Sequence, residues 1–234
     1  MQNKFDNNNF EIDTEQAKKY AFRVRLREVF TDGLFTLVKW NFLFVICSLP
    51  IVTIAPAVAA LFNCTNLQVT DDRPQFSASK WFFASFKAAC RKMFVPGIFF
   101  TLANIVLVFG FAFYLKLAGT SAVYIPLASF SLLALVIIWA VAIHAFPMIF
   151  RETDFDAGIV STNDKNLTEI AKEAAALALT KTKATAIVLI LGFAVVTAQF
   201  LFFPASTPVV LTLGFALPAQ AAALAHTEPE IIDM

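Results

Sequence analysis

The sequence predicts an all-α, polytopic helical membrane protein, and composition and charge distribution are the observations that predict it. Hydrophobic residues make up 59% of the 234 residues, charged residues make up 15%, and the mean hydropathy is +0.71. Soluble domains average roughly 45–50% apolar and about 25% charged residues. Four runs contain no Asp, Glu, Lys or Arg, namely 40–70, 93–115, 117–150 and 184–227. Each run exceeds the length of about 20 residues that a helix needs to cross a bilayer.

Residues 1–33 are expected to form a cytoplasmic segment with a basic helix over 14–30. This helix carries Lys18, Lys19, Arg23, Arg25 and Arg27. Cations just before a span usually lie beside anionic headgroups on the cytoplasmic side. No apolar core of a cleavable signal peptide occurs here, so we expect the first hydrophobic segment to target the chain to the membrane.

Residues 34–62 form the first apolar segment, and Pro50 and Pro56 interrupt it. Proline lacks a backbone donor and disfavours helix in the residue before it. The arms on either side are short for two full spans, so their length alone permits one kinked span or a hairpin of two tilted arms. Thr53 between the two prolines suits a re-entrant turn within 49–57.

Residues 76–92 are predicted to form an interfacial helix, with Lys80, Lys87 and Arg91 at i, i+7 and i+11 on one face. Trp81 and Phe86 are the aromatic residues expected to accompany these cations at the membrane surface. An equally weighted alternative is that the segment extends the following span into the cytosol.

Four further spans follow, separated by polar segments. Asn166 and Glu169 have the spacing of a capping box at the start of a cytoplasmic helix over 167–182. A polar, acidic loop over 151–166 precedes this helix, and a short cytoplasmic tail covers 226–234. The spans themselves are predicted over 93–115, 122–150, 184–203 and 206–225, within a single transmembrane domain of residues 34–225.

The distribution of Lys and Arg favours the hairpin over the single kinked span. Cations concentrate in cytoplasmic loops. If 34–62 returns to its starting side, sixteen loop cations lie inside and only Lys116 lies outside. If 34–62 crosses once, ten cations lie outside. We therefore expect a re-entrant hairpin and both termini in the cytoplasm, with the chain in the cell membrane.

No catalytic, cofactor-binding or metal-binding motif is recognisable, and we expect a protein that is not an enzyme. The chain lacks GxGxxG, P-loop, HExxH and GxSxG sequences, and its net charge of +1 gives no general attraction for nucleic acid. Polar residues inside spans are the default functional candidates. Asn41, Asn104, Gln199 and Gln220 fit interhelical hydrogen bonds better than substrate contacts. The candidate residues around the turn and in the span over 122–150 are Trp40, Asn41, Pro50, Thr53, Pro56 and His144. Trp40 has the character of an interfacial anchor, and His144 is expected to bond a carbonyl freed by Pro147 or to lie at the cytoplasmic interface.

Two stretches, LVKWNFLFVICSLPIVTIAPAVAALF at 37–62 and WFFASFKAACRK at 81–92, resemble the YesL-like family of bacterial membrane proteins, a domain of unknown function. HAFPMIFRETDF at 144–155 and EAAALALTKTK at 173–183 are also similar to it. Ala55 stands where the family pattern has glycine. Genes of this family often lie beside genes for carbohydrate uptake and polysaccharide degradation, so the resemblance implies an accessory role in sugar utilisation.

Two functional hypotheses are compatible with these observations. The first is a non-enzymatic accessory or scaffold protein of the bacterial cell membrane, with the lipid bilayer and carbohydrate importer subunits as partners. The second is a small solute channel or permease built around the 49–57 turn. Neither hypothesis fixes the solute or the oligomeric state, and a homo-oligomer is compatible with both.

Overall fold

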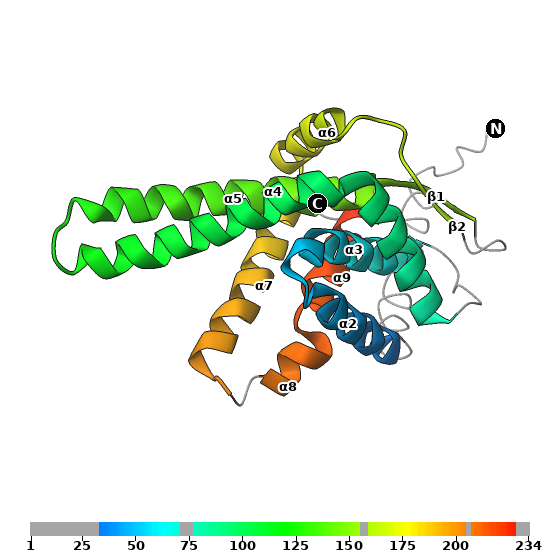
Figure 1. Cartoon of the computed structure of the whole chain (residues 1–234), viewed down its shortest axis with the longest axis horizontal. Coiled ribbons are helices and arrows are strands. Elements are labelled where there is room, and N and C mark those ends of the chain that lie inside the picture. The colour runs from blue at the N-terminus through cyan, green and yellow to red at the C-terminus, as the bar shows by residue number, and fades with distance from the viewer. Residues whose placement is uncertain (1–32, 71–76, 155–158, 205–206, 228–234) are drawn as a thin grey trace, which may run out of the picture. The chain divides into compact units, whose positions relative to one another are not determined.

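The computed structural model describes residues 33–70, 77–154, 159–204 and 207–227, and helices dominate it (Figure 1). The chain divides into two compact units, 1–36 and 37–234. Of the first unit only residues 33–36 are described, and they begin helix α2 (Leu34–Ser48). The predicted basic helix over 14–30 and most of the tail lie outside the described residues. The prediction of an all-α, multi-helix protein is confirmed by the second unit, which holds nearly all of the described residues.

The proline-broken segment forms a helical hairpin. Helix α2 ends at Ser48, the short 3₁₀ helix η1 covers Ile51–Thr53, and α3 runs over Ile54–Thr70. The Nε1–H of Trp40 donates a hydrogen bond of 2.9 Å to the carbonyl of Ala78, the first residue of α4. After α3 the chain therefore returns to the neighbourhood of Trp40, and α4 begins beside α2 (Figure 1).

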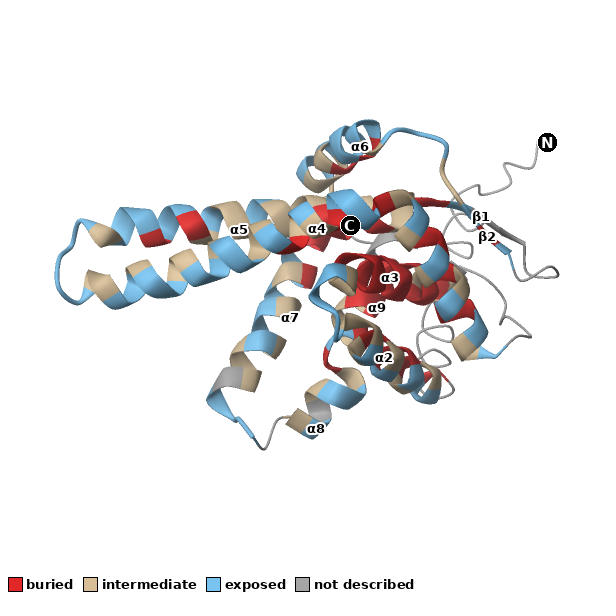
Figure 2. Cartoon of the chain, in the orientation of Figure 1, coloured by how far each residue is buried: buried red, intermediate tan, exposed pale blue. Residues whose placement is uncertain are grey.

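Helix α3 is the centre of the core. Every residue from Ala55 to Thr65 is buried, and α3 packs against α4, α5 and α9 (Figure 2). Alanine dominates this stretch, and small side chains let helix backbones approach one another closely in membranes. At Gly97 of α4 an added Cβ would lie 3.0 Å from the Cβ of Ala55, so the turn and α4 are in close contact.

Helix α4 (Ala78–Ala118) joins the predicted interfacial helix and the next span into one element with a kink. Met93 has non-helical dihedral angles, φ −122° and ψ 18°, and Pro96 follows three residues later. A proline inside a helix removes one hydrogen bond and its ring clashes with the preceding turn, which explains a kink at this place. The predicted boundary at residue 93 therefore corresponds to the kink.

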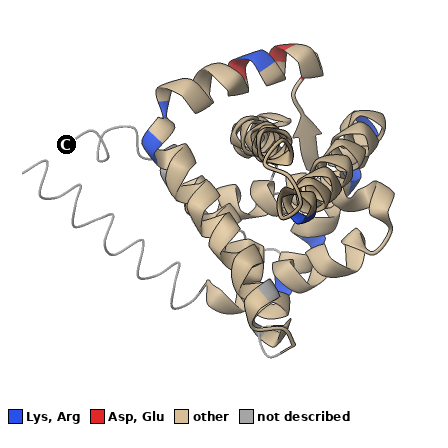
Figure 3. Cartoon of the chain, turned by 90° about the vertical axis from the view of Figure 1, so that its left-hand side faces the viewer, with Lys and Arg blue, Asp and Glu red and all other residues tan. Residues whose placement is uncertain are grey.

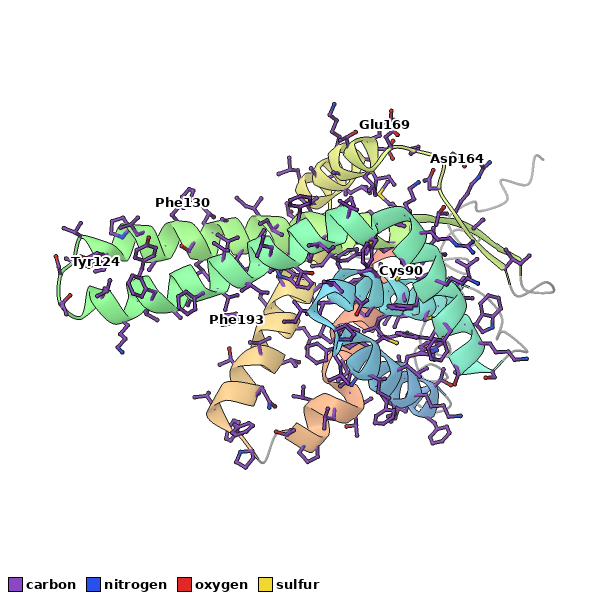
Figure 4. All side chains as sticks on the ribbon, viewed as in Figure 1. Cys90, Tyr124, Phe130, Asp164, Glu169 and Phe193 are labelled. Carbon is purple, nitrogen blue, oxygen red and sulfur yellow. The ribbon has the colours of Figure 1, made fainter. Side chains whose placement is uncertain are left out.

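Beyond the kink, α4 and α5 (Tyr124–Met148) form a long antiparallel pair. Large apolar side chains on this pair are exposed, Phe109 and Phe130 among them (Figures 2 and 4). Such a surface suits lipid and not water. Between the two helices the Trp139 Nε1–H donates to the Asn104 side-chain oxygen at 2.8 Å, and Trp139 packs edge-on against Phe100.

The prediction of a loop over 151–166 is wrong in part, because a small β-hairpin occupies most of it. Strands β1 (Phe150–Asp154) and β2 (Ile159–Thr162) pair antiparallel with an irregularity between Phe150 and Thr153. The β-branched residues of β2 favour strand over coil. Helix α6 (Leu167–Thr180) follows, and its predicted capping box is confirmed, with the Glu169 carboxylate accepting a hydrogen bond from the Asn166 N–H at 3.2 Å.

The segment predicted as the last span, 206–225, is an interrupted helix in the structure. After α7 (Thr182–Leu201), the chain forms the three-residue α8 (Thr207–Val209), the π-helix η2 (Val210–Gly214) and then α9 (Ala216–Thr227). Pro218 has no N–H for the carbonyl of Gly214, four residues before it, which favours an interruption of the helix just before α9.

Four described helices are long and apolar enough to cross a membrane. They lie in α3, α4, α5 and α7 and cover Ile51–Val69, Ala78–Ala118, Tyr124–Met148 and Thr182–Gln199. Three of these helices correspond to the predicted spans over 93–115, 122–150 and 184–203. The remaining helix, Ile51–Val69, belongs to the hairpin.

The polar segments on either side of the α4–α5 pair meet at one end. The Lys92 ammonium donates to the carbonyl of Lys165 at 2.9 Å, and α4 packs against β2. Asp164 and Glu169 lie at this end, whereas Tyr124 lies at the other (Figure 4). Segments 78–92 and 151–181 therefore share one side, as the charge distribution predicted.

Reporter fusions at Asp72 and Gly119 test this arrangement. We expect a cytoplasmic-type signal at Asp72, between the hairpin and α4, and a signal from the opposite side at Gly119, between α4 and α5. An alkaline phosphatase and green fluorescent protein pair measures both positions. A periplasmic-type signal at Asp72 would contradict the hairpin, and the same signal at both positions would mean that the second part of α4 does not cross.

Candidate functional site

The predicted turn residues lie at one interruption of the apolar helices. Asn41 lies on α2 and contacts a second interruption, at residues 210–216. Broken backbone at membrane depth must find hydrogen bonds within the protein, because lipid supplies none. The partner of each freed backbone group therefore determines what the polar side chains near the interruptions do.

Asn41 is fully buried and makes four hydrogen bonds to the broken helix near the C-terminus. Its Nδ2 donates to the carbonyls of Val210 at 3.0 Å and Leu211 at 2.7 Å. Its Oδ1 accepts from the backbone N–H groups of Phe215 and Ala216, both at 3.0 Å. An amide side chain offers two donors and one oxygen with two lone pairs, so the full capacity of Asn41 is used.

These bonds make Asn41 a cap for both halves of the interrupted helix. Val210 and Leu211 supply carbonyls that lose partners where η2 ends, and Phe215 and Ala216 supply N–H groups that lack partners where α9 begins. Phe44, one turn after Asn41 on α2, packs on Phe215 with ring centroids 5.0 Å apart. One side chain of α2 thus stabilises a break about 170 residues later in the chain.

The 49–57 turn satisfies its own backbone through Thr53. The Thr53 Oγ1 lies 2.6 Å from the Cys47 carbonyl oxygen and 2.7 Å from the Pro50 carbonyl oxygen, so its hydroxyl hydrogen is shared between them. Cys47 is in the last turn of α2, where carbonyls lack helical partners. Pro50 precedes η1 with an extended conformation, and Pro56 is fully buried in the first turn of α3. The turn therefore has a shaping role in the structure.

His144 is buried and belongs to a separate contact between α5 and α7. Its Nε2 lies 2.8 Å from Thr185 Oγ1, and that hydroxyl donates to the Lys181 carbonyl at 2.9 Å. The direction of the hydrogen bond between the ring and the hydroxyl depends on the tautomer of His144. The sequence left two positions open for His144, a bond to a carbonyl freed by Pro147 or the cytoplasmic interface, and the structure shows the ring buried beside Thr185.

Two of the aromatic residues expected at the membrane surface are buried in protein. Trp40 and Trp81 are each 2% exposed, and Phe86 is half-buried and stacked on Phe82. The expectation that Trp40 and Trp81 anchor the chain among headgroups is therefore wrong. The three cations predicted on that helix, Lys80, Lys87 and Arg91, are exposed.

The structure also brings together polar residues that the sequence did not single out as a group. Asn63 Nδ2 on α3 donates to Ser85 Oγ on α4 at 2.9 Å, and both residues are buried. Because both lie in helices with many other small residues, spacing alone gave no signal for this pair. The break at Gly214 has a clearer signal in the sequence, since a glycine four residues before Pro218 marks a weak point in a helix.

Gln220 on α9 is the least satisfied polar side chain of the site. It is 1% exposed, and neither its Nε2 nor its Oε1 has a hydrogen-bond partner among the described residues. Leaving a buried polar group without a partner costs about 1–3 kcal/mol. Ala216 and Ala223, on the same face of α9, are also buried and offer no polar group.

Side chains that could bind a metal ion do not cluster among the described residues. Among the described residues, no group of three or more His, Cys, Asp or Glu side chains gathers in a geometry that could hold a metal ion. The interior of this part of the chain contains amides, hydroxyls and one imidazole, several of them bonded to backbone carbonyls.

One family model matches the part of the chain that contains the turn and the kinked helix. Residues 37–111 match the family model described as "Protein of unknown function, DUF624". This DUF624 region covers most of α2, all of α3 and α4 as far as residue 111, and therefore includes Trp40, Asn41 and the 49–57 turn. No curated protein and no solved structure gives a significant match to the chain.

Replacing Asn41 with leucine should strongly destabilise the protein. The substitution leaves two carbonyls and two N–H groups of the η2–α9 break without partners, and we expect a loss of about 2 kcal/mol or more. Thermal unfolding of the purified protein in mild detergent measures the change. Phe42→Leu, at an exposed neighbouring position, is the control and should change the midpoint little. Equal midpoints for Asn41→Leu and Phe42→Leu would contradict the capping role.

Replacing Gln220 with methionine should stabilise the protein. Methionine has nearly the same shape but no strong polar atoms, so the cost of the unpartnered amide is removed, and we expect a gain of about 1 kcal/mol. The same unfolding assay measures it. Gln199→Met is the matched control, because Gln199 donates to Thr207 Oγ1 at 3.1 Å and should gain nothing. Destabilisation by Gln220→Met would mean that the amide is bonded in the folded protein.

Proposed function

We propose that this protein is a non-enzymatic accessory or scaffold protein of the bacterial cell membrane that assists carbohydrate uptake or utilisation. The observation that carries the proposal is that the polar groups at the two helix interruptions are bonded internally. Asn41 and Thr53 bond to backbone groups of the chain itself. A protein whose intramembrane polar groups maintain its own fold is better suited to holding partners than to passing solutes.

A polar surface at one end of the helices is the proposed place of contact with partners. It is formed by the β1–β2 hairpin and α6, where Arg151 pairs with Asp164 at 2.8 Å and Lys165 pairs with Glu173 at 2.6 Å. Exposed ion pairs add little stability, so their presence here is compatible with a surface selected for contact. The sixteen loop cations that the hairpin arrangement puts on this side favour the cytoplasm for this end and for both termini.

The link to sugars rests on the resemblance to the YesL-like family. The DUF624 match covers the 37–62 and 81–92 stretches that carry the resemblance, and is therefore compatible with it. The association with carbohydrate genes belongs to that family and comes to this chain only as part of the proposal.

A solute channel around the 49–57 turn is the weaker alternative. Such a channel would need polar groups of the turn to face a passage, whereas the Thr53 hydroxyl is shared between two backbone carbonyls. Purified protein in liposomes should therefore leave the flux of sugars and ions unchanged.

Co-purification tests the proposal directly. The protein carrying a C-terminal tag is extracted from its own bacterium in mild detergent, and its companions are identified by mass spectrometry. We expect stoichiometric recovery of importer permease or ATPase subunits. Matched variants sharpen the result, since Glu173→Lys on the polar surface should reduce recovery and Phe193→Leu on the lipid-facing side of α7 should not. Recovery of the protein alone, together with unchanged sugar uptake in a deletion strain, would contradict the proposal.

A further inference from the structure

The first part of α4 presents an exposed stripe that combines cations with one aromatic ring. Its members are Lys80, Phe83, Lys87 and Arg91, which we call the basic stripe, and all four are exposed, Phe83 by 50%. Spacings of three, four and four residues place them on one face of an α-helix. Phe83 was not among the interfacial residues predicted from the sequence, and it replaces Trp81 as the exposed ring.

The opposite face of the same helix is fixed against the protein. Its buried residues are Trp81, Phe82, Ser85, Ala88 and Ala89. Ser85 accepts a hydrogen bond from Asn63 on α3, and the Ala78 carbonyl accepts one from Trp40 on α2. The rotation of the helix is therefore set by the core, and the basic stripe points outward without any contribution from lipid.

The charge of the stripe is not neutralised by the described part of the chain. Helix α4 contains no Asp or Glu, and its cations form no ion pair with a described residue. The described acidic side chains gather on α6 and beside it (Figure 3). Asp164 pairs with Arg151, Glu173 with Lys165, and Glu169 caps the first turn of α6.

The stripe lies directly before the exposed apolar surface of α4. Phe94, Val95 and Phe99 are exposed just after Arg91, and the apolar surface continues along the helix. At 1.5 Å per residue the stripe covers about 17 Å of helix next to this surface. A cation in this position lies at the level of lipid phosphates, and a phenylalanine beside it can reach the upper acyl chains.

We propose that the basic stripe is a binding site for anionic phospholipid headgroups. Lys80, Lys87 and Arg91 contact the phosphates, with Arg91 able to bind a phosphate through two parallel hydrogen bonds, and Phe83 contacts the acyl chains. The site selects anionic over zwitterionic lipid because its cations have no acidic neighbour on the helix. This inference goes beyond the proposed accessory function and does not depend on it.

Titration of short-chain lipids into the full-length protein in mild detergent tests the site. We expect phosphatidylglycerol to bind more tightly than phosphatidylcholine of the same chain length, with a preference that falls as salt rises. Each cation near an anionic lipid contributes about fivefold, so the combined variant Lys80→Gln, Lys87→Gln and Arg91→Gln should lose about a hundredfold in phosphatidylglycerol affinity at low salt. Phe83→Gln should weaken both lipids by a similar factor.

Lys116→Gln, at the other end of α4, is the matched control and should retain the preference. All substituted side chains are exposed, so thermal unfolding should be unchanged, and the single variant Lys87→Gln provides a second measurement if the combined variant is unstable. Inorganic phosphate should bind much more weakly than phosphatidylglycerol. Equal affinity for the two lipids, an unchanged preference in the combined variant, or phosphate binding as tight as that of lipid would overturn the proposal.

Discussion

The absence of hydrogen-bonding solvent in the hydrocarbon layer is the constraint on which the rest of this structure depends. A regular helix satisfies the hydrogen bonds of its own backbone. Every interruption therefore leaves N–H and carbonyl groups that other parts of the protein must bond. This chain interrupts its apolar helices at the 49–57 turn, at Met93 and at Gly214. Thr53 supplies hydrogen bonds to backbone groups at the first interruption, and Asn41 supplies them at the last.

The interruptions also determine how the helices pack. After the 49–57 turn, α3 lies in the centre and packs against α4, α5 and α9. Its alanines allow close contacts such as that between Ala55 and Gly97. Gly97 has no Cβ, and this leaves the space that the side chain of Ala55 occupies. The two positions are best understood as one contact.

Patterns that depend on local chemistry predicted the structure well. The charge-free runs predicted the helices, and Asn166 with Glu169 predicted the start of α6. Pro50 and Pro56 predicted a break, and the distribution of Lys and Arg favoured a hairpin there. Long-range contacts escaped prediction, because Asn41 carries no sign that its partners lie at 210–216. The prediction that Trp40 and Trp81 lie among headgroups was wrong for a related reason. An aromatic ring near a cation suits both a headgroup layer and a protein core, and only the packing of α2 against α4 decides between them.

The Asn41 contact has a consequence for the order in which the molecule is completed during synthesis. Asn41 on α2 leaves the ribosome well before its hydrogen-bond partners, which follow 169 to 175 residues later. Until those residues enter the membrane, a fully polar amide on α2 has no lasting partner, and α2 remains the kind of segment that membrane quality control detects. The last helix therefore does more than add a span. It completes the first helix, so the two ends of the transmembrane region mature together, and a chain that stops before residue 210 is expected to be degraded as an unfinished product.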